Sequence, residues 1–82
     1  MKNKMGVKYN YSKLNGKIKE VMGTQSKFAE KMGLSDKSVS MKLNSERGFT
    51  TNQIFLAIEL LGIGKDEVYD YFFTKEVQKV EL

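Results

Sequence analysis

The sequence predicts an all-α domain of five short helices, and three observations carry this prediction. Apolar residues recur every three or four positions along most of the chain, as they do in helices with one buried face. Glycines stand directly after several of these stretches, where helices commonly end. The 82 residues include no proline, and this length suits one domain with a modest core.

The first helix is expected at about residues 12–22. Ser12 stands at the position of an amino-terminal cap, and Gly23 stands where the helix would end. The apolar face of this helix consists of four residues at helical spacing, namely Leu14, Ile18, Val21 and Met22.

Two shorter helices are expected next, at about residues 24–32 and 35–44. Thr24 and Ser35 are suitable caps for them. Gly33 lies between the two helices, and glycine adopts positive φ without a steric penalty. We therefore expect the chain to turn sharply at Gly33, so that the two helices meet at an angle.

The fourth helix is expected to begin with a capping box, in which Thr50 is followed by Gln53 at the third helical position. Gly62 would end this helix, whose apolar set is Ile54, Phe55, Ile58 and Leu61. A fifth helix, at about residues 65–73, begins with acidic residues where the helix dipole favours negative charge. The residues of this helix expected to face the core are Val68, Phe72 and Phe73.

The fifth helix also contains more aromatic residues than one short helix needs, namely Tyr69, Tyr71, Phe72 and Phe73. This surplus indicates a contact surface in addition to core packing. If the protein forms a dimer, we expect the contact at this helix or at the chain termini.

We divide the chain into an amino-terminal arm of residues 1–9, a helical domain of residues 10–74 and a carboxy-terminal tail of residues 75–82. Around the arm, apolar residues alternate with polar ones in the manner of a half-buried strand, at Met5, Val7, Tyr9 and Tyr11. An isolated strand is unstable, so it would have to pair with the tail or with a second copy of the chain. Disorder at both ends is the alternative.

Composition excludes several classes of function. The chain contains no cysteine and no histidine, which removes disulfides, thiol nucleophiles, zinc sites of Cys and His, and the commonest general base. We therefore expect no enzyme, no cofactor, no metal and no small-molecule ligand. No apolar run is long enough for a signal peptide or a membrane span, so we expect a soluble cytoplasmic protein.

The formal charge of +4 is unevenly distributed. Residues 1–31 carry eight lysines and two glutamates, a net +6, and residues 32–50 carry three basic and two acidic residues, a net +1. Residues 51–82 carry three lysines and six acidic residues, a net −3. The first two thirds therefore suit a polyanion, unless these lysines serve only solubility.

The spacing across Gly33 is that of a helix-turn-helix unit. Counted from Gln25 as the first position, Ala29 is fifth, Gly33 is ninth and Val39 is fifteenth. Such a unit needs a small residue where the helices approach closely, a glycine in the turn and an apolar residue at the junction. All three demands are met.

The run TQSKFAEKMGLSDKSVSMKLNSERGFTTNQIFLAIELLGI resembles the helix-turn-helix domain of the phage Cro/CI-type repressor superfamily. The flanking YSKLNGKIKEVMG and DEVYDYFF are similar to small repressor-like proteins of phages and prophages in Gram-positive bacteria. The resemblance covers residues 10–74 and implies a five-helix, lambda-repressor-like domain that binds operator DNA as a dimer. The third position after Val39 is usually apolar in this superfamily and is Lys42 here, so Leu43 is expected to fill the core instead.

The amino-terminal turn and outer face of helix 35–44 would supply contacts to base edges in the major groove. The residues assigned to bases are Asp36, Lys37, Ser40 and Met41. The residues assigned to phosphates are Thr24, Gln25, Ser38, Asn44 and Arg47. Weaker phosphate candidates are Lys17, Lys27 and Lys42.

The predicted function is a Cro/CI-like repressor, a sequence-specific transcriptional regulator that binds double-stranded operator DNA as a homodimer. The alternative is a protein-interaction module, such as an antitoxin or an anti-repressor, whose acidic carboxy-terminal third holds a basic partner. The two hypotheses differ in whether the free protein retards random duplex DNA at low salt.

Overall fold

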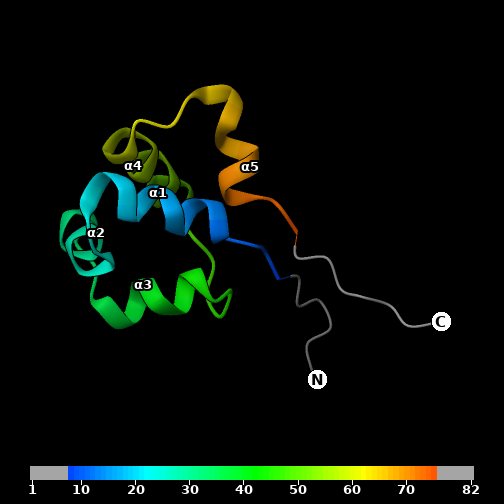
Figure 1. Ribbon diagram of the computed structural model, residues 1–82. Coiled ribbons are helices and arrows are strands. Elements are labelled where there is room, and N and C mark those ends of the chain that lie inside the picture. The colour runs from blue at the N-terminus through cyan, green and yellow to red at the C-terminus, as the bar shows by residue number, and fades with distance from the viewer. Residues whose placement is uncertain (1–7, 76–82) are drawn as a thin grey trace, which may run out of the picture.

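A computed structural model of the chain describes residues 8–75, which form five α-helices (Figure 1). The helices are α1 (Ser12–Met22), α2 (Gln25–Met32), α3 (Asp36–Leu43), α4 (Thr51–Leu61) and α5 (Val68–Phe72). A short 3₁₀ turn, η1 (Lys65–Glu67), leads into α5. The all-α class with five helices is therefore confirmed for the described part of the chain, which contains no sheet.

Helix α1 lies at the centre of the domain, and α2, α4 and α5 all pack against it (Figure 1). Helix α3 packs mainly on α2, on the side away from α4 and α5. The largest fully buried side chains are Phe28, Phe72, Leu14, Ile18 and Val39. Because α3 has few helical neighbours, its outer face is left to solvent.

The predicted caps of α2, α3 and α4 are confirmed. The hydroxyl groups of Thr24, Ser35 and Thr50 accept hydrogen bonds from backbone N–H groups three residues later, at 3.1, 3.0 and 3.1 Å. In α4 the Gln53 side chain also accepts a hydrogen bond from the Thr50 N–H at 3.0 Å, which completes the capping box. Each cap satisfies an amide that the helix itself leaves unpaired.

The cap predicted at Ser12 is wrong. Tyr11 precedes the first helical residue, and the Ser12 N–H donates to the side-chain oxygen of Asn10 at 2.9 Å. Tyr11 is only 7% exposed, and this burial, with a smaller contribution from Tyr9, raises the pKa of its phenol above the ordinary 10.0. Tyr11 therefore packs as a neutral aromatic side chain at the N-cap position, and the Asn10 side chain pairs with the first amide of the helix.

Two apolar predictions in the last helices are wrong. Phe55 is 62% exposed, while Ala57 is fully buried. Residues 54, 57, 58 and 61 form one helical stripe, whereas Phe55 lies about 100° away from it around the helix. Phe73 is 38% exposed because α5 ends at Phe72, which takes the core position.

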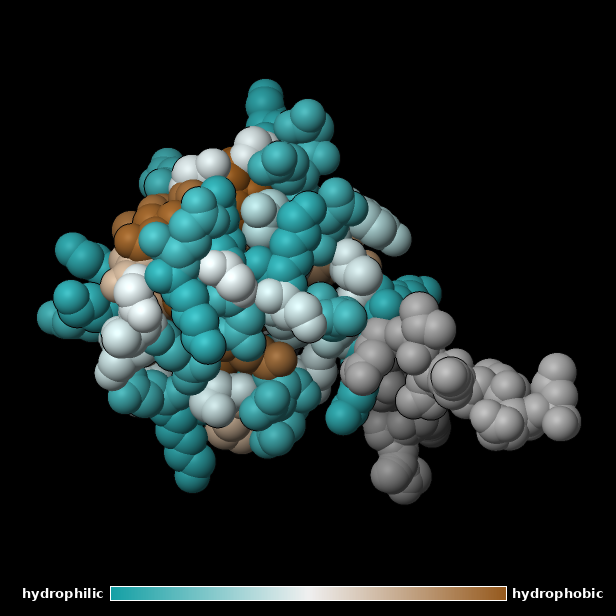
Figure 2. Space-filling view, viewed as in Figure 1, coloured by the Kyte–Doolittle hydropathy of each residue, from teal (hydrophilic) through white to brown (hydrophobic). Residues whose placement is uncertain are grey.

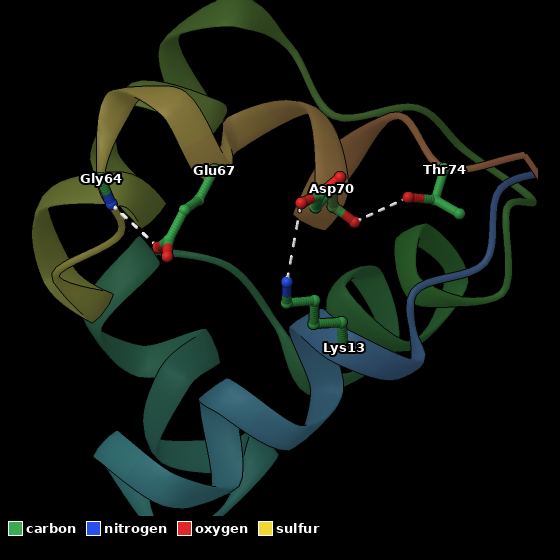
Figure 3. Close-up of polar contacts among 5 residues, drawn as sticks. All are labelled: Lys13, Gly64, Glu67, Asp70 and Thr74. Carbon is green, nitrogen blue, oxygen red and sulfur yellow. Dashed lines mark hydrogen bonds and ion pairs between the residues drawn. The ribbon is translucent and has the colours of Figure 1, made fainter.

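Polar contacts surround α5, and one of them joins it to α1 (Figure 3). The Lys13 ammonium lies 3.8 Å from the Asp70 carboxylate, and the Thr74 hydroxyl donates to the Asp70 carbonyl at 2.8 Å. At the start of η1, the Gly64 N–H donates to the Glu67 carboxylate at 3.4 Å. The five residues of α5 are too few for a stable isolated helix. Burial of Tyr71 and Phe72 holds α5 in place, because an exposed ion pair contributes little.

The two ends of the described chain lie side by side (Figure 1). Tyr9 and Lys75 form an isolated antiparallel bridge, and the Asn10 N–H donates to the Thr74 carbonyl at 2.7 Å. The Tyr9 N–H also donates a hydrogen bond to the Ser45 hydroxyl at 3.0 Å. The strand predictions for Met5 and Val7, and those for residues 76–82, lie outside the described residues.

Candidate functional site

The helix-turn-helix geometry predicted across Gly33 is present. Gly33 has φ 74° and ψ 28°, the left-handed conformation that glycine adopts readily. The Leu34 N–H donates to the Ala29 carbonyl at 2.9 Å and closes the turn. Ala29 is 1% exposed and Val39 is fully buried, so the small residue and the apolar residue occupy the junction of α2 and α3.

The amino-terminal half of α3 carries a shallow hollow that combines several of the predicted DNA-contacting residues. The hollow has a volume of about 270 Å³ and is lined by Ser35, Lys37, Ser38, Met41 and Arg47. Lys37 and Arg47 are exposed, and neither makes an ion pair within residues 8–75. The hollow thus presents two cations and one half-buried methionine to solvent.

Asp36 is exposed, but its carboxylate accepts hydrogen bonds from another helix. The Ser26 hydroxyl shares its proton between the two Asp36 carboxylate oxygens, at 3.0 and 2.9 Å. This contact joins the first turn of α3 to α2, and Ser26 as the partner was not predicted. The Asp36 carboxylate therefore braces the two helices, and its contact with a base remains a prediction.

The other predicted residues are spread over separate places. Thr24 and Gln25 lie at the start of α2, and Ser40 is half-buried on α3 outside the hollow. Asn44 lies at the other end of α3, in a second hollow of about 360 Å³ that Asn15 of α1 also lines. Thr24, Gln25, Ser40 and Asn44 therefore do not line the α3 hollow that contains Lys37.

Lys42 is wrong as a phosphate candidate, because it is buried. Its side chain is 6% exposed, and its ammonium donates to the Gly48 carbonyl at 2.9 Å and lies 5.8 Å from the centroid of the Phe49 ring. Its long apolar stem packs in the core while its charged end reaches a carbonyl and an aromatic face. Leu43 is also buried, at 9%, as predicted.

An apolar groove between α4 and α5 was not predicted as such. It has a volume of about 600 Å³ and is lined by Thr51, Ile54, Phe55, Ile58, Glu59, Lys65, Val68 and Phe73. Tyr69 is 67% exposed and lies beside Phe73, with ring centroids 6.1 Å apart. The aromatic surplus of the last helix was the sequence signal for this surface, and exposed Phe55 extends it onto α4.

The two parts of the described chain carry net charges of opposite sign. Residues 8–50 carry nine basic and four acidic residues, a net +5, whereas residues 51–75 carry two basic and four acidic residues, a net −2. In the view of Figure 2 most of the surface is hydrophilic, and the largest group of hydrophobic residues lies over the α4 side. The α3 hollow therefore belongs to the basic part of the chain, and the α4–α5 groove to the acidic part.

Two kinds of feature are absent from the described part of the chain. Among residues 8–75, no group of three or more acidic residues is placed to hold a metal ion. None of the helices in this range has the length and apolar character of a membrane span.

Comparison with known proteins finds a family and similarity to a solved structure. The family described as "Protein of unknown function (DUF739)" matches residues 7–75. No curated protein matches the chain. Among solved structures, the chain is similar to the solution structure of the modulator of repression (MOR) of the temperate bacteriophage TP901-1 from Lactococcus lactis, with 43% identity and a TM-score of 0.70. The similarity covers 79% of this chain and 88% of that chain.

These matches overturn the family predicted from the sequence. The resemblance to the Cro/CI-type repressor superfamily rests on residues 24–63 and their flanking segments, which include Ala29, Gly33 and Val39 at helix-turn-helix spacing. That spacing reports how closely two helices pack and how the chain turns between them, and such geometry does not determine a family. The Cro/CI assignment is wrong: the chain belongs to the family described as "Protein of unknown function (DUF739)".

Proposed function

We propose that this protein regulates a phage-type repressor by binding to it. The proposal rests on the similarity of this chain to a protein described as a modulator of repression. The two sequences are 43% identical, and the similarity covers 88% of that protein's chain. Our alternative hypothesis from the sequence, a protein-interaction module such as an anti-repressor, agrees with this similarity better than a repressor does. The proposal involves no catalytic step and no cofactor.

The described surface supports a role in protein contact. Phe55 and Tyr69 are more than half exposed, and both lie at or beside one apolar groove. Exposed aromatic residues next to a pocket are typical of the residues that dominate binding energy in protein interfaces. This protein therefore has a surface suited to a protein partner.

The proposal is tested by adding the purified full chain to the repressor of phage TP901-1 bound to its operator, in a gel-mobility assay. We expect the repressor–operator band to be lost or shifted further, and the operator alone to keep its mobility. The TP901-1 modulator serves as the positive control. If this chain leaves the complex unchanged at concentrations where the TP901-1 modulator acts, the proposal is wrong.

Direct contact with double-stranded DNA is a second candidate, favoured by the hollow on α3. Lys37 and Arg47 line that hollow together and are free of ion pairs within residues 8–75. Lys37 lies in the first turn of α3, where a recognition helix contacts base edges, and Arg47 lies in the loop after α3, where phosphate contact is expected.

Two substitutions distinguish these roles. We expect Lys37→Ala to change the preferred sequence at one base pair, by about 1–3 kcal/mol, because a base contact is lost. Arg47→Ala should weaken binding to all duplexes alike and reduce the salt slope by about 1. The measurement is selection of bound duplexes from a random pool, followed by titration of the enriched sequence at several salt concentrations.

Lys19→Ala, at an exposed position of α1 outside the hollow, is the control and should leave both properties unchanged. Equal effects of Lys37→Ala and Arg47→Ala on specific and random DNA would contradict the assignment of roles. Absence of any retardation at low salt would exclude the second candidate.

A further inference from the structure

The groove between α4 and α5 is lined by half-buried aliphatic residues and by exposed aromatic residues. Its floor is aliphatic, formed by Ile54 and Ile58 of α4 and Val68 of α5. Phe55 and Phe73 stand at its edges and are 62% and 38% exposed. A pocket with an apolar floor and exposed aromatic edges favours apolar side chains of a partner, because their burial removes both surfaces from water.

The segment that forms this groove, residues 51–75, carries four acidic and two basic residues. Glu59 lines the groove, and Asp66 and Glu67 follow the lining residue Lys65 in η1. These residues carry three negative charges and one positive charge, and none of the four makes an ion pair within residues 8–75. A partner with excess positive charge is therefore the electrostatic complement.

From these observations we infer that the groove binds an amphipathic helix of the repressor, with apolar residues at helical spacing and basic residues beside them. This inference rests on the proposed function and names the surface and the partner chemistry. A helix lying in a groove uses anchors at positions such as i, i+3, i+4 and i+7. The described part of this chain has no sheet edge to which a partner strand would add, which leaves helix binding as the mode that fits an aliphatic floor between two helices.

The site is located by titrating the ¹⁵N-labelled full chain with the repressor of phage TP901-1 and following amide shifts. We expect the largest shifts at Ile54, Phe55, Ile58, Val68 and Phe73. Shifts concentrated instead at the α3 hollow would overturn the inference while leaving repressor binding intact. Absence of shifts anywhere would contradict the proposed function itself, so the two failures are distinguishable.

The apolar part is tested with Phe55→Ser, which we expect to weaken binding to the same repressor at least about tenfold, since exposed aromatic anchors beside a pocket dominate such interfaces. Phe55 is exposed, so the variant should keep the fold, which its amide spectrum will report. Val21→Ser is the matched control, because Val21 is also apolar and 45% exposed but lies on α1 outside the groove. Equal affinities of Phe55→Ser and wild type would overturn the inference.

The charge and helix parts are tested separately. The double substitution Glu59→Gln and Asp66→Asn should weaken binding and flatten its salt dependence, whereas Glu30→Gln on α2 should do neither. Peptides of about 20 residues that tile the repressor should include one that binds, gains helical circular dichroism and is rich in Lys or Arg. If the repressor binds but no peptide does, or if the binding peptide is acidic, a basic helix is not the occupant.

Discussion

Replacement of Phe72 by alanine is expected to lower the free energy of unfolding by about 3–5 kcal/mol. Phe72 is 2% exposed, and its ring meets the Phe49 ring edge to face, with centroids 5.5 Å apart. Phe49 in turn contacts Tyr11 in the same geometry. The substitution removes the side chain through which α5 enters the core and leaves a cavity beside the Phe49 ring.

The neighbouring Phe73 provides a matched control. It is the same residue type one position later, but it is 38% exposed and contacts Tyr9 and Tyr69 at the surface. We expect Phe73→Ala to cost about 1 kcal/mol, since much of its ring is already in water. Urea denaturation of both variants, followed by circular dichroism, measures the difference. Similar losses from the two substitutions would show that burial of Phe72 is not what holds α5.

Replacement of Lys42 by alanine is expected to cost about 2–3 kcal/mol, an unusually large loss for a lysine. The substitution removes the buried stem, the hydrogen bond from the ammonium to the Gly48 carbonyl and the contact with the Phe49 ring. Lys42→Met separates these contributions, because methionine refills most of the stem volume but donates no hydrogen bond. We expect Lys42→Met to cost less than Lys42→Ala, about 1.5–2 kcal/mol, the lower part of the range for a hydrogen bond from a charged group.

Lys37→Met on the same helix is the control, because Lys37 is exposed and its substitution should change stability by less than about 0.5 kcal/mol. Urea denaturation again provides the measurement. If Lys42→Ala is as harmless as Lys37→Met, the ammonium of Lys42 does not organise the loop between α3 and α4.

Local features of this protein could be predicted from its sequence because each depends on residues a few positions apart. Thr24, Ser35 and Thr50 cap their helices through amides three residues later, and Gly33 turns the chain by its own backbone freedom. Part of the α3 surface was also predictable, since neighbours on one helix share a face.

The sequence by itself thus determined the all-α class, three caps and the turn between α2 and α3, because these features need only local hydrogen bonds and backbone geometry. The tertiary structure decided that Lys42 is buried, that Phe55 is exposed and that Asp36 is held by Ser26. The groove between α4 and α5 also depends on the tertiary structure. Its lining comes mainly from two helices, and hydrophobic periodicity does not predict how two helices are placed relative to each other. These features depend on how whole helices pack, which is a property of the folded chain and not of any short segment.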